Sequence, residues 1–150
     1  MTTTSLPISS KSSITVSLDS LASATYVAAT AIDLTSIDPI DCLIETVVVT
    51  TASAPSGNKQ VEVYIKYSLD GTNYTSGPES GTTTTDEPVL YRIGAIPTNG
   101  ASTTYRRTLS VREALGFCPP YIKVIYKNDL GTALSTGCSA AYATAVANNA

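Results

Sequence analysis

The fold class follows from one stretch, Lys59-Gln-Val-Glu-Val-Tyr-Ile-Lys-Tyr-Ser-Leu-Asp-Gly-Thr-Asn-Tyr-Thr75. Its odd-numbered side chains from Val61 to Leu69 are apolar or aromatic and share one face, while the other face receives Glu62, Tyr64, Lys66 and Ser68. β-Branched and aromatic residues at a period of two predict a strand with one buried face. Asp70-Gly71 then supplies the left-handed backbone that a tight turn requires.

A second run, Tyr121-Ile-Lys-Val-Ile-Tyr-Lys127, repeats this alternation and also ends in a turn, Asn128-Asp129-Leu130-Gly131. The chain is rich in residues that suit strands and turns but not helix interiors, with 23 Thr and 18 Ser. At 150 residues it fits one domain with a single core. We therefore expect an all-β fold, a single-domain β-sandwich or jelly roll in which these two strands are central.

The other elements are expected at intervals along the chain. A flexible N-terminal arm, residues 1–12, precedes the sandwich domain, residues 13–150. One short helix is expected near 111–115, because Ser110 and Glu113 form a capping-box pattern and Gly116 follows. Residues 76–88 form a long loop of low hydrophobicity, and such loops are usually functional or mobile. Further strands are expected at 13–18, 41–52, 89–96, 103–110 and 140–146, and residues 26–34 are expected to be a strand or an extended segment.

The charge content argues against nucleic acid as the main partner. Nine Lys and Arg oppose twelve Asp and Glu, the formal net charge is -3, and Arg106-Arg107 is the only adjacent basic pair. Phosphate binding requires clustered basic residues. Only 14% of the residues are charged while 43% are apolar, which suggests that other subunits cover part of the surface. A monomer solvated by Thr and Ser stays open as the alternative.

The three cysteines, Cys42, Cys118 and Cys138, are expected to be buried free thiols, and we expect no metal site and no cofactor. Their number is odd, they form no CxxC pair, and the chain has no histidine. A Cys42–Cys138 or Cys118–Cys138 disulfide remains an alternative. The N-terminus lacks the pattern of a signal peptide, and no apolar stretch reaches the ~20 residues of a membrane span, so we expect a soluble protein made in a cytoplasm.

Enzymatic function is the least favoured class. Without histidine, Ser-His-Asp and Cys-His sites cannot be built. Two groups of acids, Asp38 with Asp41 and Glu45, and Glu79 with Asp86 and Glu87, could supply a carboxylate pair for glycoside hydrolysis. Nothing in the sequence fixes the distance within either group, and solvated turn residues explain the loop acids more simply. We expect no catalytic residues and no small-molecule substrate.

Binding or assembly is therefore the class of function that remains, and seven residues are candidates for an interface. The arm carries apolar anchors, the long loop carries a proline and an acid, and two tyrosines are expected on exposed surfaces, where tyrosine suits protein interfaces and sugars. The candidates are Leu6, Pro7, Ile8, Tyr64, Tyr74, Pro78 and Glu79.

Two segments resemble small structural proteins of tailed bacteriophages: the block 61–91, with its Ser68-Leu-Asp-Gly-Thr-Asn-Tyr74 hairpin, and Pro119-Pro-Tyr-Ile-Lys-Val-Ile-Tyr-Lys-Asn-Asp-Leu-Gly131. Within that group the chain is most similar to capsid decoration (cement) proteins, and the similarity covers roughly residues 13–146. The resemblance implies a non-enzymatic virion protein on the capsid exterior, made in the bacterial host cytoplasm. It implies binding to the major capsid protein, bridging of coat subunits, and a homodimer or homotrimer, with no nucleic acid or membrane partner.

Two alternatives remain. Within the virion, the chain could be a tail or head–tail component. From a different class, it could be a β-sandwich that binds a host glycan, with Tyr64 or Tyr74 stacking on the sugar. The resemblance lies in the fold, so it transfers no contact residues.

Overall fold

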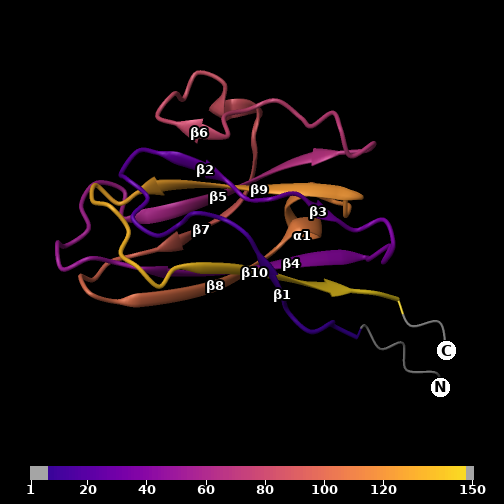
Figure 1. Ribbon diagram of the computed structural model, residues 1–150, viewed down its shortest axis with the longest axis horizontal. Coiled ribbons are helices and arrows are strands. Elements are labelled where there is room, and N and C mark those ends of the chain that lie inside the picture. Colours follow the sequence, from indigo (N-terminus) through magenta and orange to yellow (C-terminus); the bar gives the residue numbers. More distant parts are fainter. Residues whose placement is uncertain (1–6, 148–150) are drawn as a thin grey trace.

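Two antiparallel sheets pack face to face in the computed structural model, which describes residues 7–147 (Figure 1). The all-β sandwich expected from the sequence is confirmed. In Figure 1 one sheet forms the lower layer and the other the upper layer, and a further segment that contains β6 lies above the upper layer.

The lower sheet has four strands among the described residues, in the order β1-β10-β4-β8. Its strand β4 is central and pairs with β8 and β10 on either side. The strands are β1 (Ser12–Ile14), β4 (Asp41–Val49), β8 (Thr104–Ser110) and β10 (Ser139–Ala145).

The upper sheet follows the order β6-β2-β9-β5-β7 within the same part of the chain, and β3 pairs with the same edge of β9 as β2, nearer the start of β9. The two strands that define the fold class, β5 and β9, are neighbours at its centre, with Gln60 opposite Asp129 and Ser68 opposite Tyr121. The strands are β2 (Tyr26–Ala28), β3 (Ile32–Asp33), β5 (Gln60–Ser68), β6 (Ser80–Gly81), β7 (Tyr91–Pro97) and β9 (Tyr121–Asp129).

The N-terminal strands are shorter than expected. The strand predicted at 13–18 ends at Ile14, and the one predicted at 26–34 divides into β2 and β3. Between β2 and β3, the Thr30 amide donates a hydrogen bond to the carbonyl of Thr15, which follows β1 of the other sheet. This hydrogen bond joins the two sheets and interrupts the ladder with β9. Tertiary hydrogen bonding has here overridden the local alternation.

The core lies between the sheets and takes one face from each. Large side chains with less than 2% exposure fill it: Leu18, Leu34, Ile44, Val48, Ile65, Ile96, Ile122, Tyr126, Leu130 and Leu134. One polar pair is buried with them, because the Tyr126 and Thr46 hydroxyls hydrogen-bond at 2.9 Å. This bond satisfies both groups, so neither incurs the cost of an unpaired buried hydroxyl.

The short helix α1 (Val111–Leu115) is confirmed with the expected ends. The Ser110 hydroxyl accepts from the Glu113 amide at 3.0 Å, and Gly116 has the left-handed conformation (φ 83°) that ends the helix. Asp41 supports the same turn, since its carboxylate accepts from the Ser110 hydroxyl and the Arg112 amide. The helix contacts β4 and β7, and so closes one end of the sandwich.

The segment 76–90 covers the outer face of the upper sheet; we call it the strap. It includes β6 and the 3-10 helix η1 (Glu87–Val89), and Leu90 at its end packs in a small cluster with Tyr26, Tyr64 and Ile125. Both faces of β5 are therefore buried over Tyr64–Lys66. The expectation of one exposed face is wrong for this part of the strand.

Residues 7–12 of the expected flexible arm follow β10. The Ser9 amide donates to the Thr144 carbonyl at 2.9 Å, Ile8 forms a bridge with Ala145, and Lys11 pairs with Glu45 at 2.7 Å. The rest of the expected arm lies outside the described residues. Residues 7–12 are therefore an extension of the lower sheet.

Candidate functional site

Exposed large apolar side chains gather at one end of the sandwich. Across residues 7–147, six such residues are exposed: Ile8, Ile37, Leu69, Val89, Tyr91 and Phe117. All except Val89, which is on the strap, belong to the end at which β5, β8 and β10 finish and β4, β7 and β9 begin. We call this the apolar end; its loops and strand ends lie to the right in Figure 1.

The topology brings these residues together from distant parts of the sequence. Leu69 follows Ser68, which pairs with Tyr121 at the start of β9. Ile37 lies in the link from β3 to β4, and Phe117 in the link from α1 to β9. Ile8 pairs with the last residue of β10. Each residue alone would be an ordinary exposed apolar side chain, but a group of them at one end is a candidate interaction surface.

Leu69 is the most exposed of the five, at 75%, and it sits on a well-fixed turn. The Asp70 carboxylate accepts hydrogen bonds from both the Asn73 amide and its side chain, from the Thr72 amide and from the Ser68 hydroxyl. These bonds, with those from Asn73 the largest contribution, hold the pKa of Asp70 well below its usual range. The turn is therefore preorganised, and binding through Leu69 requires little further ordering.

Several aromatic rings lie next to this turn. The Tyr67 ring lies 5.4 Å from the Tyr91 ring and 5.4 Å from the Phe117 ring, which it meets edge to face. Gly71 (φ 78°) lies against the Tyr121 ring, where a Cβ would come within 3.0 Å of it. A hollow of about 450 Å³ beside Leu69 is lined by Tyr67, Ser68, Leu69, Asp70, Asn73, Tyr74 and Thr75.

The opposite end of the sandwich has a different character. It consists of the links 15–25, 50–59, 98–103 and 130–138, and none of the six exposed large apolar residues of the described chain lies in them. Threonine, serine, asparagine and glycine dominate these links. The molecule is thus polarised along its strands, with one apolar end and one polar end.

The seven interface candidates from the sequence are scattered. Pro7 and Ile8 lie at the apolar end, next to the end of β10, and Leu6 lies outside the described residues. Tyr74 lines the hollow there, partly covered by the Lys123 ammonium 4.6 Å from its ring centre. Tyr64, Pro78 and Glu79 instead belong to the contact between the strap and the upper sheet.

The expectation that Tyr64 lies on an exposed face is wrong. It is only 4% exposed beneath the strap, and its hydroxyl donates to Glu62 at 2.9 Å. Burial, reinforced by this hydrogen bond, raises the pKa of Tyr64 to about 12. A covered, hydrogen-bonded ring cannot stack on a sugar, so Tyr64 leaves the set of candidate binding residues.

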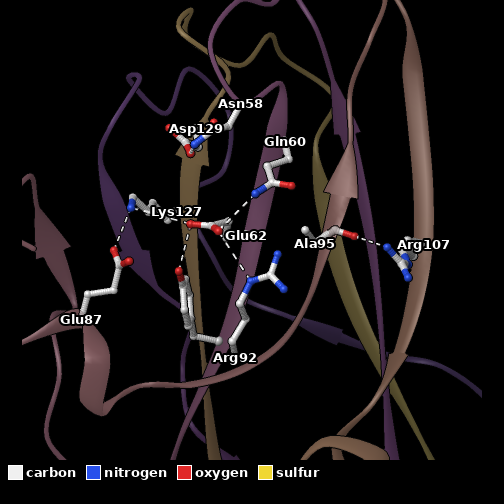
Figure 2. A network of polar contacts seen from close by, with 10 residues as sticks. Asn58, Gln60, Glu62, Glu87, Arg92, Ala95, Arg107, Lys127 and Asp129 are labelled. Carbon is white, nitrogen blue, oxygen red and sulfur yellow. Dashed lines mark hydrogen bonds and ion pairs between the residues drawn. The ribbon is translucent and has the colours of Figure 1, made fainter.

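Glu62 is the centre of a polar network under the strap (Figure 2). It accepts from Gln60 and Tyr64, and it also pairs with Arg92 at 3.5 Å and Lys127 at 3.7 Å. Lys127 in turn reaches Glu87 of the strap at 2.7 Å. The network therefore ties η1 to the centre of the upper sheet.

A second ion-pair group attaches the beginning of the strap. Glu79 binds the ammonium of Lys66 at 2.6 Å and that of Lys123 at 3.1 Å. Burial opposes ionisation of Glu79, but the hydrogen bonds and charges of the two lysines outweigh it and lower its pKa. The lysines, glutamates and arginine on this face thus form ion pairs that connect the strap to the upper sheet.

Four of the six carboxylates considered for hydrolysis are engaged in separate structural contacts, and the other two, Asp38 and Asp86, are exposed. Asp41 caps α1, Glu45 pairs with Lys11 and Arg106, and Glu79 and Glu87 fasten the strap. Among residues 7–147, no group of three or more Cys, Asp or Glu is arranged to hold a metal ion. In the same range, none of the helices has the length and apolarity to cross a membrane.

The three cysteines are free, so neither disulfide considered from the sequence is formed. Cys42 is buried, as expected, whereas Cys118 and Cys138 are half-buried. Burial raises the pKa of Cys42 to about 12 and that of Cys118 to about 11. Since the thiolate is the reactive form, both thiols are poor nucleophiles.

No protein-family model matches the chain, and no curated protein matches it.

Proposed function

We propose that this chain is a non-enzymatic structural protein of a tailed-bacteriophage virion, which binds the outer capsid surface through its apolar end and bridges coat subunits. The observation that carries the proposal is the gathering of Ile8, Ile37, Leu69, Tyr91 and Phe117 at one end of a sandwich whose other end is polar. The resemblance of its hairpins to phage structural proteins supplies the virion context.

A polarised sandwich suits attachment to a shell. The apolar end would face the coat protein, and the Thr- and Ser-rich end would face solvent. Burying a large apolar side chain contributes about 1.5–3 kcal/mol, but association and side-chain ordering cost roughly 4–15 kcal/mol, so the apolar end of one copy provides only a modest affinity. Simultaneous contacts with neighbouring coat subunits would multiply that affinity, and each bound copy would stabilise the shell by mass action.

The hollow beside Leu69 favours one alternative, a host-glycan-binding module. Its lining combines Tyr67 and Tyr74 with Asp70 and Asn73, residue types that bind sugars. The Asp70 carboxylate, however, already accepts hydrogen bonds within its own turn, so fewer acceptors remain for a sugar. A tail or head–tail position is the other alternative, and it would use the same apolar end.

The test has two steps. First, quantitative mass spectrometry of purified particles measures the copy number of the chain relative to the major coat protein; decoration predicts a ratio on the order of one or a sizeable fraction of one. A ratio at least about tenfold lower moves the chain to the tail or a vertex, and absence from particles rejects a virion role.

The second step identifies the attachment surface. Purified chain is added to expanded capsids that lack it, and Leu69→Ala is compared with Val89→Ala, a matched loss of an exposed apolar side chain away from the apolar end. We expect Leu69→Ala to weaken retention about tenfold, or ~1.4 kcal/mol, and Val89→Ala to leave it unchanged. Equal retention of all three proteins would contradict attachment through the apolar end.

A further inference from the structure

We propose that the apolar end receives a basic partner surface: a protein with an apolar recess for Leu69 and lysine or arginine side chains around it. This deepens the proposed function, because it concerns the same surface and specifies the chemistry of its partner. It also means that a second copy of this chain is not the occupant of that surface.

The argument begins with the charges around the apolar end. Five carboxylates lie on its strand ends, links and helix: Asp33, Asp38, Asp41, Asp70 and Glu113. Most of the cations near this end are paired within the chain: Lys11 with Glu45, Arg92 with Glu62, and Lys66 and Lys123 with Glu79. Residues 33–41, 69–75 and 111–120 add one further cation, Arg112. The apolar end is therefore an apolar patch with an acidic rim.

Four of these carboxylates are exposed: Asp33, Asp38, Asp70 and Glu113. Asp33 lies opposite Tyr121 in the β3–β9 pairing, Asp70 follows Leu69 in the turn, and Asp38 is next to Ile37. Two of the acids thus directly adjoin an exposed apolar side chain, as expected where an apolar contact is ringed by a polar rim.

Local hydrogen bonds keep two of these acids charged. The hydroxyl of Thr35, followed by its amide, donates to the Asp33 carboxylate and lowers its pKa. The Asp70 carboxylate is stabilised in the same way by its own turn. The acidic rim therefore persists wherever ordinary carboxylates are ionised, and it is a constant feature of the surface.

The same rim disfavours end-to-end pairing of two copies. A two-fold contact through the apolar end would bring Asp38 and Asp70 of one copy toward the acids of the other, while most cations near this end are already paired within their own copy. Like charges across an interface are unfavourable and suppress wrong partners. A homodimer or homotrimer, as the resemblance implies, would have to form through another surface.

The test uses the isotopically labelled full chain and two short model peptides, one alternating leucine with lysine and the other leucine with glutamate. Amide chemical shifts report where each peptide binds and how tightly. We expect the lysine peptide to shift signals of Ile37, Leu69 and Phe117 and to bind at least about tenfold more tightly than the glutamate peptide. Raising salt from about 0.1 to about 1 M shortens the Debye length from about 10 to about 3 Å and should reduce this preference.

Two variants identify the charges responsible. Asp33→Asn with Asp38→Asn removes two rim charges but retains an oxygen for Thr35, and asparagine tolerates the left-handed backbone of residue 38 (φ 48°). We expect this double variant to bind the lysine peptide several-fold more weakly. Asp86→Asn, an exposed acid on the strap, is the control and should change nothing.

Equal binding of the two peptides, or shifts confined to the polar end, would overturn the proposal. If the double variant is not folded, its spectrum shows this directly, and the salt series on the unchanged chain still decides the matter. The outcome is separate from that of the particle experiment: a chain absent from virions could still prefer the basic peptide, and a decoration protein could show no preference.

Discussion

Leu90→Ala measures how firmly the strap is fixed to the upper sheet. Leu90 is 7% exposed and packs against Tyr26, Tyr64 and Ile125. Truncating a buried leucine to alanine costs about 2–5 kcal/mol, depending on how completely the site can collapse. The cluster is small and near the surface, so solvent or a strap movement can fill part of the void. We expect a loss of about 2–3 kcal/mol in the free energy of unfolding, within the lower part of that range.

Urea unfolding followed by circular dichroism gives this free energy, and a loss of 2–3 kcal/mol corresponds to a fall in Tm of roughly 4–12 °C for a chain of this size. Leu69→Ala is the matched control: it is the same substitution at a side chain that is 75% exposed, so its effect should stay within about 0.5 kcal/mol. Equal effects at the two positions would refute the reasoning, because they would mean that the strap does not bury Leu90 in solution.

Three other predictions concern acid, base and the N-terminus. The pKa values of Glu45 and Glu79 are lowered in the fold, so the stability that these residues contribute is present above their unfolded pKa of about 4.3 and is lost as pH falls through the folded pKa values. The urea concentration at the unfolding midpoint should therefore decrease as the pH is lowered below about 4.3. This decrease should be less steep for Glu79→Gln. Tyr64 and Tyr126 have pKa values of about 12 in the fold against about 10 when unfolded, so the stability that they contribute is present below about pH 10 and is lost as the pH rises above it. In a rapid spectrophotometric titration of the tyrosines, Tyr64→Phe and Tyr126→Phe should each reduce the absorbance change of the last group to ionise. A reduction in an earlier step would contradict the burial of these two rings. Deleting residues 2–6 should leave the unfolding midpoint unchanged and weaken attachment to capsids. Deleting residues 2–12 also removes the Ser9–Thr144 and Lys11–Glu45 contacts and should lower the unfolding midpoint. If the shorter deletion leaves capsid occupancy unchanged, the arm is not part of the attachment surface.

The strap explains where many of the charged residues of this chain are used. Lys66, Lys123 and Lys127 emerge from the two central strands and meet Glu79 and Glu87 of the strap. Partly buried pairs of this kind fix the position of a segment that contributes few apolar side chains of its own. The strap has the composition of a mobile loop, but its ion pairs and the packing of Leu90 attach it to the upper sheet.

The local pattern of the sequence determined the two central strands and the short helix of this protein. Alternation in β5 and β9 and the strength of their apolar faces specify two central strands, because a one-residue slip would expose the whole inner face. Ser110 and Gly116 specify both ends of α1 through hydrogen bonds and backbone conformations that involve only neighbouring residues.

Only the tertiary structure decided which faces are covered and where the apolar end forms. Tyr64 has the alternation of an exposed residue, but a segment that begins 12 positions later folds over it. Ile37, Leu69 and Phe117 are unremarkable in the sequence and become one surface only when the strand order sets their links at the same end. A period of two reports which side a residue faces, whereas cover and clustering depend on contacts between distant segments, which no local pattern encodes.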